Sequence, residues 1–196
     1  MAYNTREITH GTNNVAMGAG QDGQAGTGLI YSTGVAKFAP STDQDNKDIF
    51  ADSQSHMVLL NPKQITIEMD NYQYTKEEFE QMGYNVDTSG AMTDNGSNKP
   101  FAIQRLLKVL DAKGTETQRL EVFYNVTSSD YSENDDEDED EINPKIYTRT
   151  LKVGGIDVNG TNVKKLVVIR NSSNATQFDK YKTKIMLPSD FATATK

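Results

Sequence analysis

The chain of 196 residues contains no cysteine, which excludes disulfide bonds and thiolate chemistry. It contains two histidines, His10 and His56, which lie too far apart in the sequence to have the spacing of a metal site. No apolar run approaches the roughly 18 residues needed to span a bilayer, and the N-terminus lacks the basic and then apolar segments of a secretory signal. We therefore predict no metal, no cofactor, no membrane segment and a protein that begins in the cytosol.

Hydrophobic residues are also scarce, at 35% of the chain. Ordinary globular domains have about 45–50%, a figure that includes glycine. The length is sufficient for one domain with a core of its own, and the many Thr, Asn and Asp residues favour exposed turns and long loops. We expect one domain with a thin core.

The net charge of −8 is unevenly distributed, because residues 130–141 hold nine acids and no base. Without these nine, the acids nearly balance the 20 Lys and Arg residues. Tight phosphate binding requires clustered Lys and Arg, which the rest of the chain does not show. Specific recognition of nucleic acid is therefore not expected.

Three interpretations of the acidic run are open: a flexible solvated loop, charge facing an internal channel, or a divalent-cation site. The run lacks the glycine of the 12-residue calcium-binding loop, and like charges this close repel one another unless they are screened. We favour the solvated loop, with the channel as the main alternative. The candidate residues are Glu133, Asp135, Asp136, Glu137, Asp138, Glu139, Asp140 and Glu141.

A helix is predicted within the segment NYQYTKEEFEQMGYN, over about residues 75–82. Thr75 can accept a hydrogen bond as the N-cap, and Glu78 can reach back to the amide of Thr75, which together form a capping box. Gly83 can adopt the left-handed conformation that ends a helix. A helix of roughly two turns is marginal alone, so it must pack against something larger.

Aromatic residues concentrate around this helix. Tyr74 and Phe79 have the spacing of a hydrophobic staple, and Phe79 and Met82 lie on one face of the helix. The aromatic rings could stack on single-stranded nucleic acid, but no basic residues are interleaved with them. We instead predict that they anchor the helix to a sheet or fill a seam between subunits. The candidate interface residues are Tyr72, Tyr74, Phe79, Met82, Tyr84, Tyr124 and Tyr147.

Most of the remaining chain has the pattern of strands. Alternation over residues 65–69 indicates a half-buried strand that leads into the helix. Residues 101–111 fit both helical and strand spacing, but the turn-like DAKGT that follows and the alternation over residues 120–126 favour an antiparallel hairpin. Further strands are predicted at residues 29–38, 57–60, 146–153, 163–169 and 181–187.

The two ends of the chain are predicted to be arms. Residues 1–28 contain six glycines and few large apolar residues, and residues 189–196 are small and polar. The single domain between them, residues 29–188, is predicted to be mainly β, a β-sandwich or partly open barrel with one short flanking α-helix. Exposed edge strands are commonly paired with neighbouring copies, and ring closure removes the edges altogether. These features point to self-assembly.

Several segments resemble the major tail (tail tube) proteins of long-tailed phages that infect Gram-positive bacteria. The similarity is carried by the helix segment above and by KPFAIQRLLKV, RLEVFYNVTSSDYSE and YTRTLKVGGIDV, and it covers roughly residues 57–188. The resemblance implies a β-sandwich subunit that assembles into stacked, usually hexameric rings around a DNA channel, with the arms and a long loop clasping neighbours. It also implies a place in the virion tail after assembly in the host cytoplasm, with tape-measure and tail-end proteins as partners. DNA would pass through without specific binding.

Two other classes of function remain open at this point. One is another phage structural β-sandwich, such as a baseplate, capsid-decoration or receptor-binding protein, which would stop at a closed oligomer. The other is a hydrolase that uses paired carboxylates, but the sequence offers no recognisable nucleophile, base or metal set and no two acids held rigidly. We therefore predict a structural tube subunit that is not an enzyme.

Overall fold

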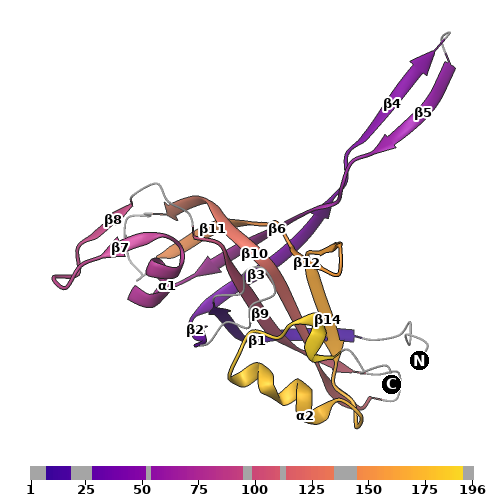
Figure 1. The fold of residues 1–196 in the computed structure, drawn as a ribbon. Helices are drawn as coiled ribbons and strands as arrows, with labels where there is room; N and C mark the ends of the chain where they lie inside the picture. Colours follow the sequence, from indigo (N-terminus) through magenta and orange to yellow (C-terminus); the bar gives the residue numbers. More distant parts are fainter. Residues whose placement is uncertain are drawn as a thin grey trace.

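The computed structural model describes residues 8–18, 28–51, 54–94, 99–110, 114–134 and 145–191. Its main feature is an antiparallel sheet of eight strands in the order β2-β1-β9-β10-β11-β6-β3, with β14 beside β10 (Figure 1). These strands are β1 (Ile8–Gly18), β2 (Ile30–Ser32), β3 (Val35–Asp43), β6 (Gln64–Asn71), β9 (Phe101–Leu110), β10 (Glu116–Asn134), β11 (Ile146–Val153) and β14 (Lys165–Ile169). The chain is mainly β, as the sequence predicts.

Short hairpins and helical segments complete the described chain. The hairpins are β4 (Asn46–Ala51) with β5 (Gln54–Leu60), β7 (Tyr84–Val86) with β8 (Met92–Asp94), and β12 (Ile156–Val158) with β13 (Thr161–Val163). The helices are α1 (Lys76–Gln81) and α2 (Ala175–Phe178), and the 3-10 segments are η1 (Asp179–Lys182) and η2 (Pro188–Asp190). In the described ranges, no helix has both the length and the apolar character needed to cross a bilayer.

The sheet curls so that its two end strands come close together. Strand β2 ends at Ser32 and β3 begins at Val35, and Gly34 between them has a φ of 87°, which glycine adopts without steric cost. Across the curl, Arg105 of β9 donates from Nη1 to the carbonyl oxygen of Phe38 of β3 over 2.9 Å. Strands β2 and β3 pair with β1 and β6 and not with each other. The curled sheet is therefore not a closed barrel.

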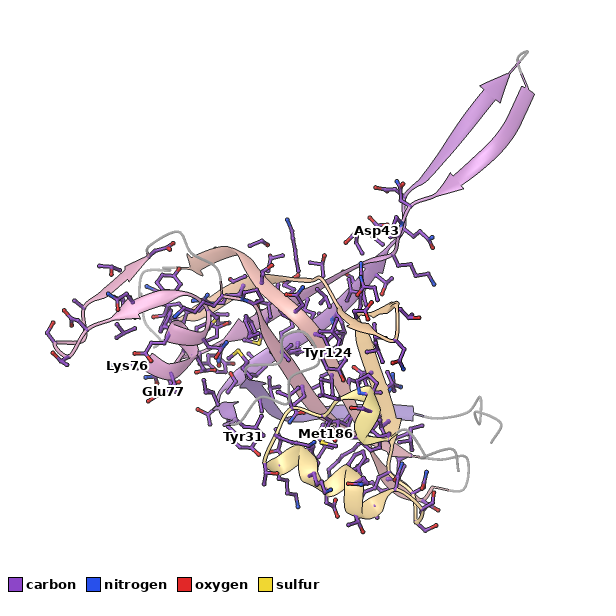
Figure 2. All side chains as sticks on the ribbon, in the orientation of Figure 1. Tyr31, Asp43, Lys76, Glu77, Tyr124 and Met186 are labelled. Carbon is purple, nitrogen blue, oxygen red and sulfur yellow. The ribbon has the colours of Figure 1, made fainter. Side chains whose placement is uncertain are left out.

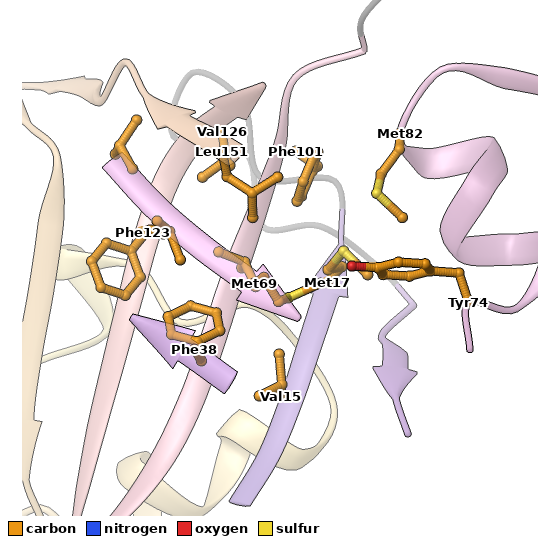
Figure 3. Close-up of a cluster of buried hydrophobic side chains, with 13 residues drawn as sticks. Val15, Met17, Phe38, Met69, Tyr74, Met82, Phe101, Phe123, Val126 and Leu151 are labelled. Atoms are coloured by element: carbon orange, nitrogen blue, oxygen red, sulfur yellow. The ribbon is translucent and has the colours of Figure 1, made fainter. Parts of the chain in front are cut away.

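The inside of the curl is filled by one hydrophobic core, shown in Figure 3. Its buried members are Val15, Met17, Phe38, Ile67, Met69, Tyr74, Met82, Phe101, Ile103, Phe123, Val126, Leu151 and Val153. The rings of Phe38 and Phe123 lie 5.9 Å apart although their strands, β3 and β10, are not neighbours in the sheet. Burial of each large side chain contributes about 1.5–3 kcal/mol, so this core holds the curl together.

The opposite face of β9 and β10 carries a second core, which the C-terminal segment covers. Its buried members are Ala102, Leu106, Leu120, Val122, Tyr124, Ile156, Phe178, Tyr181, Ile185, Met186 and Leu187. Tyr124 donates from its hydroxyl to the carbonyl oxygen of Met186 over 2.6 Å, and both residues are labelled in Figure 2. Gln104 donates from Nε2 to the carbonyl oxygen of Tyr181 over 2.7 Å. Side-chain hydrogen bonds thus fix the cover to the sheet.

The structure of the C-terminal segment corrects the prediction of a strand over residues 181–187. Residues 179–182 form η1, and residues 185–187 are irregular. The apolar residues Ile185 and Leu187 alternate as a strand would, but they are buried against the face of the sheet and do not extend its edge. The predicted strand over residues 163–169 is also divided, because β13 ends at Val163 and β14 begins at Lys165.

The predicted N-terminal arm is corrected in part, because β1 lies inside the sheet between β2 and β9. Val15, Ala16 and Met17 are buried within it. Gly11 and Asn14 have positive φ where the pairing with β9 shifts register, so Gly11 lies at a bulge in a strand. Residues 1–7 and 19–27 lie outside the described residues.

Two other predicted boundaries also move. The acidic loop, predicted from residue 130, cannot begin before residue 135, because β10 continues to Asn134 and pairs with β11. The C-terminal tail, predicted from residue 189, begins inside η2, and Phe191 packs against the second core. Residues 135–144 and 192–196 lie outside the described residues.

Tyr124→Phe should destabilise the protein, because it leaves the buried carbonyl oxygen of Met186 without its hydroxyl donor. The expected loss in the free energy of unfolding is about 1–3 kcal/mol, measured by urea denaturation. Tyr72→Phe is the matched control, because the Tyr72 side chain is 48% exposed and its hydroxyl keeps access to water. Equal effects of the two substitutions would contradict the assigned role of Tyr124.

Candidate assembly site

Strand β10 pairs with two different strands along one of its edges. Residues 119–123 pair with β14, and residues 126–134 pair with β11. At the change of partner, Asn125 has a φ of 51°, and its carbonyl oxygen accepts a hydrogen bond from the Gly154 amide over 2.9 Å. After β11 ends at Val153, the chain moves away from the edge of β10, forms the β12–β13 hairpin and returns to the same edge as β14. Strand β14 therefore continues the line of β11.

The outer edge of β14 is open among the residues that the structure describes, since β14 pairs there with β10 alone. The Tyr124 amide donates to the carbonyl oxygen of Lys164 over 3.1 Å, and the Arg170 amide donates to that of Gln118 over 2.8 Å. Because hydrogen-bonded pairs alternate along an antiparallel ladder, the backbone N–H and C=O groups of the even-numbered residues of β14 point toward β10. The backbone N–H and C=O groups of residues 165, 167 and 169 point away from it, and among them the carbonyl oxygen of Ile169 already accepts a hydrogen bond from Nδ2 of Asn174 over 2.9 Å. Another strand could pair with this edge.

Beside this edge, one buried carboxylate is surrounded by three cations. The Glu121 side chain is 2% exposed, and its Oε2 accepts hydrogen bonds from Nε and Nη2 of Arg105 over 2.9 and 2.7 Å. Its Oε1 contacts Nη2 of Arg119 at 2.5 Å and Nζ of Lys165 at 2.9 Å. Lys165 belongs to β14, so the ion pair links the open strand to β10.

The charge state of Glu121 follows from these neighbours. Burial by itself raises the pKa of the Glu121 carboxyl. Hydrogen bonds and charge attraction from Lys165 and Arg105 outweigh this effect and hold the pKa below its ordinary value of 4.5. The carboxylate is thus charged at neutral pH and offsets part of the positive charge around it.

A second buried charge, Arg149 of β11, attaches the α1 region to the sheet. Its side chain is 1% exposed, and Nη1 donates to the Ser128 hydroxyl over 3.4 Å. The guanidinium carbon lies 4.7, 5.2 and 5.4 Å from the ring centroids of Tyr74, Phe79 and Tyr84. Desolvated cation–π contacts of this kind contribute about 2 kcal/mol or more.

The predicted helix and its capping are confirmed. Helix α1 runs from Lys76 to Gln81, and Thr75 is its N-cap. The amide of Glu78 donates to Oγ1 of Thr75 over 3.3 Å, and the amide of Thr75 donates to Oε2 of Glu78 over 2.6 Å. The rings of Tyr74 and Phe79 are in contact, with their centroids 5.7 Å apart, as in a staple. Local sequence signals therefore define this helix.

The structure places most of the predicted interface residues within the subunit. Tyr74 and Met82 are buried in the first core, and Phe79, Tyr84 and Tyr147 pack against that core. These positions fit the predicted anchoring of the helix to the sheet. Tyr124 is fully buried in the second core, far from α1 in sequence, which corrects its prediction as an interface residue. Tyr72, at 48% exposure, stays a predicted contact residue.

The predicted acidic site is only partly described. Glu133 lies in β10, where its backbone pairs with Tyr147 of β11. Asp135, Asp136, Glu137, Asp138, Glu139, Asp140 and Glu141 lie outside the described residues. Their orientation toward a channel stays a prediction.

The hairpin of β4 and β5 projects from the body of the subunit (Figure 1). At its base, the Asn61 amide donates to the carbonyl oxygen of Asp45 over 3.0 Å, and Gln44 Nε2 donates to that of Asn61 over 2.9 Å. Sequence analysis identified part of β5 but missed β4, whose sequence NKDIFA lacks clear alternation. It also missed the Glu121 cluster, although Glu121 lies in a predicted strand and Arg119 is two residues before it.

Within the described ranges, no three or more His, Cys, Asp or Glu side chains gather in a way that could hold a metal ion. The features that stand out are a curled sheet, an open strand edge and a projecting hairpin, which are features of a structural subunit that contacts other proteins. Comparison with known families agrees, since residues 1–194 match the family described as phage tail tube protein.

The chain therefore belongs to the phage tail tube protein family, a family of structural proteins of the phage tail. This confirms the resemblance to major tail proteins and extends it from residues 57–188 to nearly the whole chain. No curated protein matches the chain.

Glu121→Gln should lower the free energy of unfolding by about 3–5 kcal/mol at neutral pH, because three cations then lose their carboxylate. Glu116→Gln, on the same strand, is the control, since the Glu116 side chain is 50% exposed in its pair with Lys108 and should contribute far less. Urea denaturation of both variants measures the difference.

The effect of Glu121→Gln should also depend on pH. A carboxyl whose pKa is lowered by folding stabilises the protein fully above its unfolded value, here about 4.5, and this stability is lost as pH falls through the folded pKa. The gap between wild type and Glu121→Gln should therefore shrink below pH 4.5. A gap that stays constant from neutral to acidic pH would rule out this assignment.

Arg149→Ala should lower the free energy of unfolding by about 2 kcal/mol or more, because the rings of Tyr74, Phe79 and Tyr84 lose their cation and its packing. The near-ultraviolet circular dichroism signal of the tyrosines should weaken, because their side chains are packed less rigidly. Lys152→Ala, at an exposed position of the same strand, is the control. The account fails if both variants lose the same stability.

Proposed function

We propose that this chain self-assembles into stacked hexameric rings, and that the rings form the tail tube through which phage DNA is ejected. The observation that carries this proposal is the open outer edge of β14, in a chain of the tail tube family. An unpaired strand edge readily accepts another strand, and ring closure satisfies such an edge in every subunit. Each β14 would thus add a strand of the next subunit to its own sheet.

The projecting hairpin of β4 and β5 supports the same proposal. A two-stranded hairpin outside a larger sheet is at best marginally stable in water, so packing against another subunit would stabilise it. It extends the β3–β6 ribbon, and the Asp43 label in Figure 2 marks the place where it leaves the body. In a stack of rings, this hairpin would reach a neighbouring subunit.

The charge distribution suits a conduit that does not hold DNA. Many cations of the described surface are already engaged by carboxylates, as in the pairs Lys37–Glu68, Lys108–Glu116, Arg170–Asp179 and Lys184–Asp190. Such pairs leave little net positive charge for phosphate, and the acidic residues 135–141, if they faced the channel, would repel it. DNA would then pass without specific binding.

Other partners and the place of assembly follow from the same proposal. A tube of defined length needs a tape-measure protein inside it and proteins that close its ends, and assembly would take place in the host cytoplasm. The Gram-positive host stays a prediction of the resemblance. The assembly role predicted for the N-terminal arm is best tested by deletion of residues 1–7, because removal of residues 1–28 would also delete β1 from the core.

Val167→Pro tests the role of the open edge. Proline removes one backbone N–H that points away from β10, a position where an edge strand tolerates proline. Negative-stain electron microscopy of wild type should show rings or tubes, whereas Val167→Pro should stay a folded monomer by circular dichroism and sedimentation. If wild type does not polymerise alone, initiator proteins are added to both wild type and Val167→Pro.

Val167→Ala is the matched control, because it removes the same side chain but keeps the N–H, and it should polymerise. Tubes formed by folded Val167→Pro would refute the edge-pairing model. A single small closed oligomer of wild type at every concentration, even with initiator proteins, would instead favour a non-tubular structural protein.

A further inference from the structure

The β12–β13 hairpin turns through the dipeptide Asn159–Gly160. Val158 pairs with Thr161, so Asn159 and Gly160 form the whole loop. Their φ values are 53° and 77°, and two positive values are the signature of a type I′ turn. Both residues are exposed, and there is open space where a side chain of Gly160 would lie. The turn is thus accessible to solvent and unhindered on the glycine side.

An asparagine followed by glycine can modify itself without an enzyme. The Gly160 nitrogen loses its proton to water or hydroxide and attacks Cγ of Asn159, which forms an N–Cγ bond. The Cγ–Nδ2 bond breaks, and the leaving nitrogen takes up a proton and departs as ammonia. Water then opens the five-membered imide at either carbonyl and yields aspartate or isoaspartate. Glycine favours this path because it has no Cβ to hinder the attacking nitrogen.

The structure places a carboxylate within hydrogen-bonding distance of the nitrogen that must react. The amide of Gly160 donates a hydrogen bond to Oδ1 of Asp157 over 3.0 Å. A charged acceptor strengthens such a bond, so it keeps on the nitrogen the proton that must leave before the nitrogen can attack. We propose that Asn159 is a site of spontaneous deamidation and that the Asp157–Gly160 hydrogen bond restrains it in the folded protein.

Modification at this turn would disturb the second core. Isoaspartate adds one methylene to the backbone, so a two-residue loop can no longer keep Val158 opposite Thr161. Ile156, at the start of the hairpin, is 2% exposed in that core, and Val158 and Val163 pack against the core. Each event also adds a negative charge next to Asp157. Loss of the restraint would therefore loosen the hairpin and, through it, the base of β14.

The test compares deamidation of wild type, Asp157→Ala and Asp157→Asn in mildly alkaline buffer. Peptide mass spectrometry measures conversion at Asn159, and Asn159→Ala supplies the blank. Native Asp157→Ala should react about tenfold faster than wild type, which corresponds to a hydrogen bond of about 1.4 kcal/mol. Asp157→Asn keeps an acceptor oxygen without charge and should be intermediate.

Two controls separate the restraint from other effects. In urea, where the turn is unfolded, wild type and Asp157→Ala should react at similar rates, which excludes a purely local sequence effect. Tyr124→Phe lowers overall stability with Asp157 intact and should accelerate the reaction less than Asp157→Ala does. Equal native rates for wild type and Asp157→Ala, or no conversion of Asn159 in either, would overturn the proposal.

Discussion

Strand β10 is the constraint on which the rest of the structure depends. Residues 120–124 are buried on both faces, because the curl of the sheet covers one face and the C-terminal segment covers the other. Along its length, β10 pairs with β9 on one edge and with β14 and β11 on the other. The position of the open edge follows from this arrangement.

The buried Glu121 cluster shows how the fold accommodates charge beside that edge. Arg105 binds both Glu121 and the carbonyl oxygen of Phe38, so one guanidinium joins β9, β10 and β3. Lys165 brings β14 into the same network. Isolated buried charges are strongly unfavourable, and the cluster is stable only because its members are together. It therefore couples the curl of the sheet to the placement of β14 and its open edge.

Local features of the fold could be predicted from the sequence, and features set by distant contacts could not. The capping box at Thr75 and the β9–β10 hairpin depend on residues close in sequence, and both are confirmed. Strand β1 was missed because its burial depends on β9, some 90 residues away, and residues 181–187 alternate like a strand although they cover a face. The pairing of all the strands determines which of them keeps an open edge. The residues of β14 alone therefore could not predict that its edge is open.

Hydrogen exchange of the β14 amides in the subunit and in the assembled tube tests the central claim most directly. In the free subunit, the amides of Leu166 and Val168 should be protected by β10, while those of Lys165, Val167 and Ile169 should exchange quickly. Assembly should protect the second set and leave the first set protected. Fast exchange of Lys165, Val167 and Ile169 in assembled tubes would contradict the account.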